Sequence, residues 1–389
     1  MAYVYLIPSI QDYAHKFRKI DSIDFKIIKS ASAGGFLSVG SLAESTGIPK
    51  QTVSYHLRKL QRDVVRFRVL LDESKLGLKS FVVTATTQLG QEKMSSRAMT
   101  CFPLWRYLAI VDGCKRGNYV RYCIPSGNER DFGAFLNEVK RRNLISEFEV
   151  FPTSNTNYPL LNLDFYVRKR GFPVFNWDKW VNDFDKLATE TLVEPQSYDK
   201  FGVDIYDLII LRCLEIDART NQRRIVKEIA RILNEKKSKK FIPLVSRRMR
   251  QDILGNGLIR GYRVYLYPNP VSSTLFLMYH LTFANSPSLS KFVTALSYLP
   301  YNTSFEKVLG KNELFVRFIL PAYEYPNLWK SLASLAEQGF LKEARLFFGD
   351  LANKTWDNVE IYQMFKNNNW NFSYGIAVEM LEKTLAAAR

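Results

Sequence analysis

Histidine and cysteine are scarce in this chain, which has three histidines and four cysteines among its 389 residues. The cysteines form no Cys-x-x-Cys pair, and His15, His56 and His280 stand far apart in the sequence, so a zinc site is not expected. No paired carboxylates, Ser/His/Asp set or glycine-rich phosphate loop stands out either. We therefore expect no metal, no cofactor and no enzymatic activity.

Long apolar runs are also missing. Residues 1–9 are apolar, but they are too few to cross a bilayer and lack the basic start of a signal peptide. Unpaired cysteines suit the reducing conditions of the cytosol. We expect a cytoplasmic protein that does not engage a membrane.

Positive charge, by contrast, is abundant and concentrated. The net charge is +17, and two windows, residues 47–68 and 221–250, together carry 14 of these excess charges. Each window coincides with an expected helix-turn-helix, so double-stranded DNA is the expected partner and nucleoid association the expected location. The chain is too long for one ordinary core, and its 47% hydrophobic content suits two to four folded domains.

Two copies of one plan are expected in the chain. Residues 121–125 align without a gap to residues 317–321. From there to Phe151 in the first segment and Phe347 in the second, the apolar residues of both segments fall at matching positions, with the periodicity of a helix followed by that of a strand. We expect an α+β protein with tandem winged helix-turn-helix domains, each followed by a βαββαβ ferredoxin-like domain. The expected parts are an N-terminal arm (1–20), a first winged domain (21–77), a first ferredoxin-like domain (78–155), a helical connector (156–202), a second winged domain (203–270), a second ferredoxin-like domain (271–350) and C-terminal helices (351–389).

The first winged domain is indicated by spacing. Ala43, Gly47, Val53 and Leu57 supply a small residue at a helix crossing, a flexible turn and two apolar anchors one helical turn apart. With the anchors inside, the third helix would present its polar face to a major groove. That face holds Gln51, Thr52, Ser54, Tyr55, Arg58 and Lys59, and phosphate contacts are expected from Lys50, Arg66 and Arg68. The alternative is a small helical packing module.

The second winged domain has a longer and strongly basic turn. Its third helix offers Ser246, Arg247, Arg248 and Arg250, of which Arg247 and Arg250 are expected to read bases. Phosphate contacts are expected from Arg224, Lys227, Lys236, Lys237, Lys239 and Lys240. The inserted lysines fit either a loop over the phosphate backbone or a solvated excursion, and the sequence favours neither.

Residues 245–250 (Val-Ser-Arg-Arg-Met-Arg) and 257–262 (Gly-Leu-Ile-Arg-Gly-Tyr) resemble the Lrp/AsnC transcription regulators. The resemblance implies a winged DNA-binding domain joined to a ferredoxin-like domain that forms homodimers and can sense an amino acid. The Gly-Asp-x-Asp-like turn of that family is absent here, since the corresponding turns read Gly-Cys-Lys-Arg-Gly-Asn-Tyr at 113–119 and Leu-Gly-Lys-Asn-Glu at 309–313. The effector therefore stays unidentified.

Three functions are compatible with this pattern. The first is a transcription regulator that reads an asymmetric site through two unlike recognition helices. The second is an architectural or silencing protein that coats DNA with little sequence preference. The third is an enzyme, because some relatives of this fold are siroheme decarboxylases that retain the winged domain.

Overall fold

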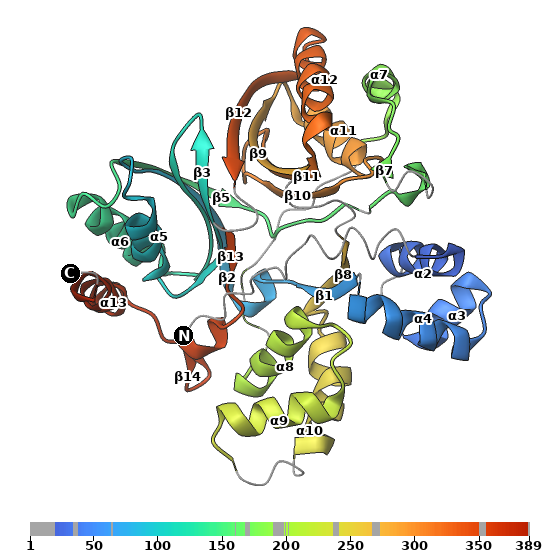
Figure 1. The fold of residues 1–389 in the computed structure, drawn as a ribbon. Helices are drawn as coiled ribbons and strands as arrows, with labels where there is room; N and C mark the ends of the chain where they lie inside the picture. Colours follow the sequence, from blue (N-terminus) through green and yellow to red (C-terminus); the bar gives the residue numbers. More distant parts are fainter. Residues whose placement is uncertain are drawn as a thin grey trace.

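The computed structural model describes residues 20–33, 38–63, 65–159, 161–167, 172–189, 198, 200, 202–235, 241–266, 273–349 and 355–387. The expected N-terminal arm, apart from residue 20, and the lysine insert at 236–240 lie outside these residues. Helices and antiparallel strands alternate along the chain, which confirms the expected α+β class (Figure 1). None of the helices in the described residues combines the length and apolar character needed to span a bilayer.

The chain begins with three short helices and a strand, which are α2 (Ser22–Ala33), α3 (Val39–Thr46), α4 (Lys50–Asp63) and β1 (Val65–Leu71). Asp21 and Asp24 cap α2 reciprocally, each accepting the backbone N–H of the other at 2.8–3.0 Å. Ser38 caps α3, and Gly47 ends it with a φ of 68°, a left-handed conformation that favours glycine. These local signals place the turn before α4 where the sequence predicts it.

A βαββαβ succession follows β1. It comprises β2 (Leu78–Thr86), α5 (Glu92–Thr100), β3 (Trp105–Gly113), β4 (Gly117–Pro125), α6 (Glu129–Arg141) and β5 (Glu147–Thr153). The strands pair in the order β3-β4-β2-β5, all antiparallel. Every residue of β4 is buried, because β4 is an inner strand whose two faces are both covered.

The second half of the chain contains similar elements in the same sequence. Three helices and a strand come first: α8 (Ile205–Ile216), α9 (Gln222–Ile232), α10 (Phe241–Arg248), which continues as a π-helical turn (Met249–Leu254), and β8 (Ile259–Leu266). The strands and helices that follow are β9 (Thr274–Phe283), α11 (Ser286–Leu296), β10 (Asn302–Lys307), β11 (Glu313–Pro321), α12 (Tyr325–Glu337) and β12 (Leu341–Gly349). These strands pair in the order β10-β11-β9-β12.

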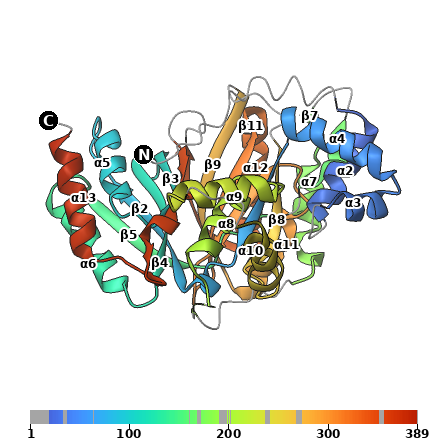
Figure 2. The same ribbon diagram turned by 90° about the horizontal axis from the view of Figure 1, so that it is seen from below.

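The two sets of strands form one large antiparallel sheet that curves round on itself. At one seam β12 pairs with β3, with Phe347 opposite Gly113. At the other, two isolated bridges connect the halves: Thr153, at the end of β5, pairs with Val308, the residue after β10, and Asn157 pairs with Phe305 of β10. The hydrophobic cluster that includes Tyr119, Phe151, Phe276, Phe315 and Phe347 fills the space inside the curved sheet. Helices α5 and α6 cover the outer face of one half, and α11 and α12 cover the other (Figures 1 and 2).

Strands β1 and β8 pair with each other, although nearly 200 residues separate them in the sequence. Their two-stranded antiparallel sheet runs from Val65 opposite Leu266 to Leu71 opposite Ile259. Each strand also packs on the helices of the other half of the chain. Val264 of β8 joins the core beneath α2 and α4, while Leu71 of β1 joins the core beneath α8 and α9. The sequence predicted two separate wing strands, and the structure instead pairs them.

The remaining segments brace this body. In the connector, α7 (Trp177–Asn182) packs on α12, and Trp177 donates to Glu324 at 2.7 Å, in line with the expected amphipathic helix. The C-terminal segment adds β13 (Thr355–Asp357) to β3, forms the small β14 (Phe365–Lys366) and β15 (Asn369–Trp370) hairpin, and ends with α13 (Tyr374–Ala386) near α5 and α6. The assignment of domain boundaries stays a prediction.

Because Val264 of β8 packs in the core beneath α2 and α4, a substitution there should destabilise helices that lie about 200 residues earlier in the sequence. Val264→Ala removes two methyl groups from a side chain that is 7% exposed, and we expect a loss of about 1–3 kcal/mol in the free energy of unfolding. Amide hydrogen exchange should accelerate in α2 and α4. The control Val150→Ala, at a surface position of β5, should leave that exchange unchanged. If the amides of α2 and α4 exchange at the same rate in Val264→Ala as in the wild type, β8 does not stabilise the first helical core.

Candidate functional site

Helix α4 carries an outward face of polar and basic side chains. Val53 and Leu57 are fully buried beneath it, as the spacing of these anchors predicts. On the opposite side Lys50, Gln51 and Arg58 are exposed, and the ring of Tyr55 is 62% exposed. Thr52 and Ser54 are half-buried at the margins of this face. An exposed aromatic beside amide and guanidinium groups provides the hydrogen-bonding and apolar contacts that base edges require.

A cluster of charges fixes α4 against α2. The Nδ1 atom of His56 lies 2.7 Å from Asp24, and the Lys59 ammonium lies 2.8 Å from Asp24 and 3.7 Å from Asp21. The ligand atoms of Asp21, Asp24 and His56 are close enough to hold a metal ion, within 4.8 Å of one another. The Lys59 ammonium already supplies a cation to both carboxylates, however. Lys59 is therefore tied to α2, and its hydrogen bond to Asp24 is the main cause of the raised pKa of its ammonium group.

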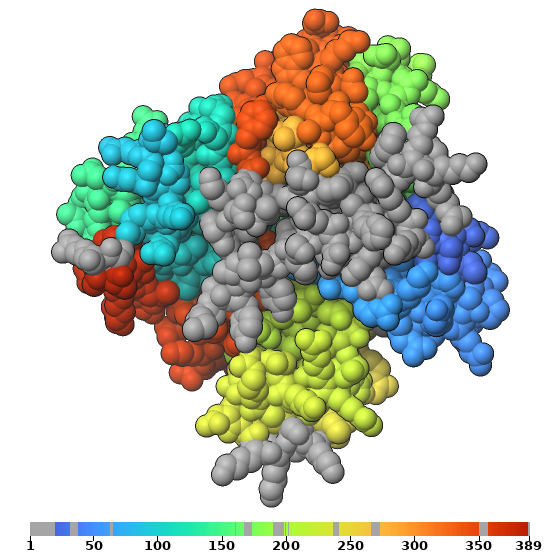
Figure 3. Space-filling view, viewed as in Figure 1, coloured from blue at the N-terminus to red at the C-terminus, as the bar shows by residue number. Residues whose placement is uncertain are grey.

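The helices of the second half present a similar set of basic side chains. Arg224 and Lys227 on α9 are exposed, as are Arg247 on α10 and Arg250 in the π-helical turn. Arg250 donates to the half-buried Ser246 hydroxyl at 3.2 Å. In the space-filling view, the helices of each half form a separate projection from the body (Figure 3).

Besides Lys59, two basic residues expected at the DNA surface make internal ion pairs. Arg248 pairs with Asp204 and Asp207 of α8 at 2.7 and 2.9 Å, which fastens the α10 end to the helix beneath it. Arg68 lies on the less buried face of β1, where it pairs with Asp357 at 3.1 Å and lies 4.8 Å from the centroid of the Tyr265 ring. These partners come from β13 and β8, which lie beside this end of β1. Arg66, two residues before, is exposed.

The structure also contains a pocket that the sequence reasoning missed. This central pocket has a volume of about 100 Å³ and lies where the β1–β8 sheet meets the large sheet, α8 and the segment after β13. Five arginines line it: Arg68, Arg106, Arg121, Arg260 and Arg317. One signal could have pointed to it, because Arg121 and Arg317 occupy equivalent places in the aligned segments 121–125 and 317–321.

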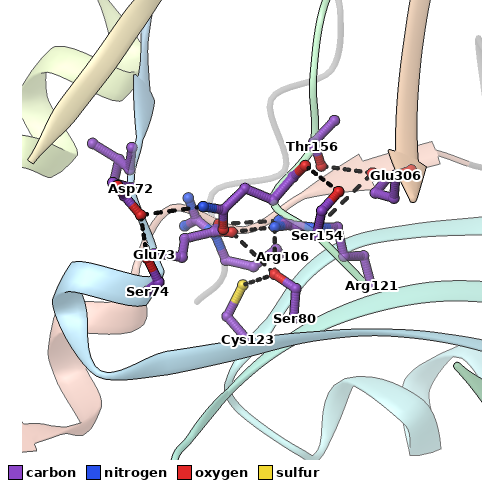
Figure 4. Close-up of polar contacts among 12 residues, drawn as sticks. Asp72, Glu73, Ser74, Ser80, Arg106, Arg121, Cys123, Ser154, Thr156 and Glu306 are labelled. Atoms are coloured by element: carbon purple, nitrogen blue, oxygen red, sulfur yellow. Dashed lines mark hydrogen bonds and ion pairs between the residues drawn. The ribbon is translucent and has the colours of Figure 1, made fainter. Parts of the chain in front are cut away.

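Buried ion pairs hold three of these arginines, Arg106, Arg121 and Arg317, in place. Figure 4 shows the contacts of Arg106 and Arg121. Glu73 accepts hydrogen bonds from Arg121, at 3.0 Å for one of them, and lies 3.3 Å from Arg106. Arg106 also pairs with Glu215 of α8. Burial alone would raise the pKa of Glu73, but Arg121 and Arg106 outweigh burial and lower that pKa to about 2. Glu73 is therefore ionised and holds Arg106 and Arg121 of the first βαββαβ set, while the pair of Arg106 with Glu215 reaches the second half of the chain.

A second acid anchors the opposite side of the pocket. Glu306 of β10 is fully buried, accepts from Arg317 at 2.5 Å and from the Thr156 hydroxyl at 2.6 Å, and lies 3.9 Å from Nε of Arg121. Arg317 and Arg121 therefore face the same carboxylate from the two halves of the sheet.

The remaining histidine of the described residues plays a structural part. His280 is 2% exposed, stacks on Phe315 with ring centroids 4.3 Å apart, and lies 3.0 Å from Glu313. Burial lowers its pKa, which favours the neutral ring. No histidine of the described residues lines the central pocket.

A winged helix-turn-helix DNA-binding family matches the chain at residues 20–63. This match covers α2, α3 and α4, and confirms the expected winged helix-turn-helix at the N-terminal end of the chain. No curated protein matches the chain.

Several solved structures are similar to the chain. The siroheme decarboxylase NirDL is similar over 94% of this chain and 99% of its own, with 12% identity and a TM-score of 0.48, and its complex with an iron-uroporphyrin III analogue gives 0.49. Two regulators align to 34% of this chain with TM-scores of 0.27: an AsnC family transcriptional regulator from Agrobacterium tumefaciens, at 20% identity over 88% of its length, and LrpC from B. subtilis, at 19% over 92%. At these values the similarities assign no activity.

The comparison with NirDL corrects one expectation. The sequence led us to exclude enzymatic activity, and that exclusion is wrong as stated, because an enzyme is among the structures similar over nearly the whole chain. The scarcity of histidine and cysteine excludes only those active sites that depend on histidine or cysteine, and it does not exclude other kinds of catalysis.

The buried ion pairs of Glu73 predict an acid-dependent stability. Because its pKa is lowered in the folded state, ionised Glu73 stabilises the fold above its ordinary value of 4.5, and this contribution is lost as the pH falls towards 2. Glu73→Gln leaves two buried arginines short of a partner, so we expect it to lower the free energy of unfolding at pH 7 by about 3–5 kcal/mol.

The difference between Glu73→Gln and the wild type should shrink between pH 4.5 and 2 in denaturant titrations. Glu44→Gln, at an exposed position of α3, is the control and should follow the wild type at every pH. A constant difference across this range would contradict the assigned role of Glu73.

Proposed function

We propose that this protein is a DNA-binding transcription regulator that reads an asymmetric site with two non-identical winged domains. The observation that carries the proposal is the family match at residues 20–63 together with the exposed polar face of α4 in the same segment. A helix with buried apolar anchors and an outward face of Gln51, Tyr55 and Arg58 suits insertion in a major groove. The charge of +17 supplies the attraction for phosphates.

The proposal extends to an internal duplication. The elements from α2 to β5 recur in the same order from α8 to β12, and both sets of four strands follow the same pairing order. The antiparallel β1–β8 pair joins the two sets as a symmetric contact would join two identical chains. On this interpretation, one chain is a covalent pseudo-dimer of two winged and two ferredoxin-like domains.

The two recognition helices differ in sequence, so the two half-sites should differ as well. Helix α4 offers Gln51, Tyr55 and Arg58, whereas the second domain offers Arg247 and Arg250. Arginine favours guanine and glutamine favours adenine in the major groove. A second pair of DNA-binding heads would be available if two chains associate through their ferredoxin-like domains.

Competition between DNA molecules tests the proposal against non-specific coating. DNA fragments selected by the protein from its source genome should bind at least about 10³-fold more tightly than bulk DNA at physiological salt. Both kinds of binding should weaken by roughly 10³ to 10⁵ between 50 and 200 mM salt if six to ten phosphates are contacted. Equal affinity for selected and bulk DNA would instead support an architectural protein, and no binding at low salt would refute the proposal.

Substitutions should separate base reading from phosphate contact. We expect Arg247→Ala with Arg250→Ala to abolish sequence preference at one half of a footprint, at a cost of about 1–3 kcal/mol for each base contact. Lys227→Ala should weaken binding to all sequences about equally and reduce the salt slope by about 1. Arg97→Ala, exposed on α5 and distant from both winged domains in the fold, is the control. Identical effects of the two sets on specificity would contradict the division of roles.

The same preparation should be mixed with siroheme, since the similar NirDL structures are of a siroheme decarboxylase. A regulator of the proposed kind leaves the absorption spectrum of siroheme unchanged. Protein-dependent conversion of siroheme, with no preference among DNA sequences, would replace the proposal with an enzymatic function.

A further inference from the structure

We propose that the central pocket binds a small carboxylate and that its occupancy changes the affinity of the protein for DNA. The coupling to DNA rests on the proposed function, whereas the binding of the carboxylate does not. The pocket is lined by five arginines and by three carboxylates, those of Glu73, Glu215 and Asp357. A fourth carboxylate, that of the buried Glu306, pairs with Arg317 behind the lining, so one arginine is in excess of the carboxylates.

Arg260 is the arginine of the pocket whose positive charge is least compensated by a carboxylate. Its guanidinium donates to the Leu71 carbonyl at 3.1 Å, to the Asn157 side-chain oxygen at 2.6 Å and to the Thr156 carbonyl. Within the part of the chain that the structure describes, no carboxylate forms an ion pair with it. These neighbours are uncharged and orient the guanidinium of Arg260, which lines the cavity and is exposed to solvent. The carboxylates of Glu73 and Asp72 act on it only from beyond contact distance. A guanidinium held in this way suits the planar geometry of a carboxylate.

A second donor in the pocket is unsatisfied. The Nε atom of Arg121 is buried and has no hydrogen-bond partner among the described residues, and the nearest Glu306 oxygen, at 3.9 Å, is too distant for one. The Arg121 side chain is only 6% exposed, so water competes poorly for this donor. A buried donor without a partner destabilises the fold, and an oxygen atom of a ligand that reached it would recover part of that cost.

The size and walls of the cavity limit the ligand. Its volume of about 100 Å³ is below the roughly 150 Å³ that admits benzene in an engineered protein cavity, but the pocket is partly open to solvent. Its enclosed part therefore takes one carboxylate group, and the rest of a short ligand extends towards the open side. Tyr107, Tyr158 and Tyr265 line the pocket beside the arginines, and rings of this kind can cover the carbon atoms of a short acid. A short mono- or dicarboxylate meets both conditions.

The position of the pocket provides the link to the winged domains. Its walls come from β1, from β8, from Glu215 of α8 and from both halves of the large sheet. The β1–β8 pair is also part of the cores beneath α4 and beneath α8. A ligand that prefers one spacing of these walls shifts the relative position of the two recognition helices, and therefore their fit to DNA.

Titration calorimetry tests the binding step on the full chain. The probes are acetate, malonate and succinate, with malonamide as the neutral analogue of malonate and inorganic phosphate as a different anion. All are used at equal ionic strength without divalent cations. We expect at least one of the carboxylates to bind with a dissociation constant below 10 mM, an order-of-magnitude limit that corresponds to about 3 kcal/mol, and malonamide not to bind.

Variants locate the site. Arg260→Gln should weaken carboxylate binding about tenfold or more, Arg260→Lys should weaken it less, and Arg97→Gln on α5 should not change it. Thermal unfolding of each variant checks that it is folded. The inference is overturned if no carboxylate binds, if malonamide or phosphate binds more tightly than every carboxylate, or if folded Arg260→Gln binds like the wild type.

Fluorescence anisotropy with a selected DNA fragment tests the coupling. A saturating carboxylate should change DNA affinity at least about threefold in the wild type and not in Arg260→Gln. Carboxylate binding without any DNA binding would refute the proposed function and leave the pocket assignment intact. DNA binding that ignores a bound carboxylate would overturn the coupling, and DNA binding without carboxylate binding would overturn the pocket assignment alone.

Discussion

The pairing of β1 with β8 is the constraint on which the arrangement of this protein depends. The two strands are distant in sequence, yet each completes a core whose helices come from the other half of the chain. Neither three-helix unit is therefore independent of the other. Backbone hydrogen bonds between the strands act together with apolar contacts along the buried face of β1, which reaches both helical cores, so α4 and α10 keep a defined relation.

The curved sheet extends this constraint to the rest of the molecule. Its two halves meet along β3–β12 and at the bridges between the β5 segment and β10, and buried arginines from both halves converge on Glu306. Because Glu73 and Glu215 bind the same Arg106, the ion pairs also fasten α8 to the sheet. Such buried pairs stabilise little by themselves, but removing one partner is costly, which favours a single arrangement. The central pocket lies at the meeting point of these contacts.

Much of this fold was predictable because its signals are local. Gly47 forms the turn after α3, and Val53 and Leu57 are buried, both as the spacing of these residues predicted. The β1–β8 pairing was not predictable, since an alternating strand such as residues 65–71 does not specify its partner. For the same reason Arg68 was expected at the DNA surface but faces the pocket, and Arg248 could not be recognised as a partner of Asp204. The pocket itself is built from segments that only the tertiary fold brings together.

Hydroxyl-radical footprinting of the full chain on a selected DNA fragment tests the central claim most directly, that one chain holds two unlike reading heads in a fixed relation. The account predicts two protected segments of different sequence on one face of the duplex, with centres about 34 Å apart or a multiple of that distance. Protection of a single segment, or of two segments whose spacing varies among fragments, would contradict it.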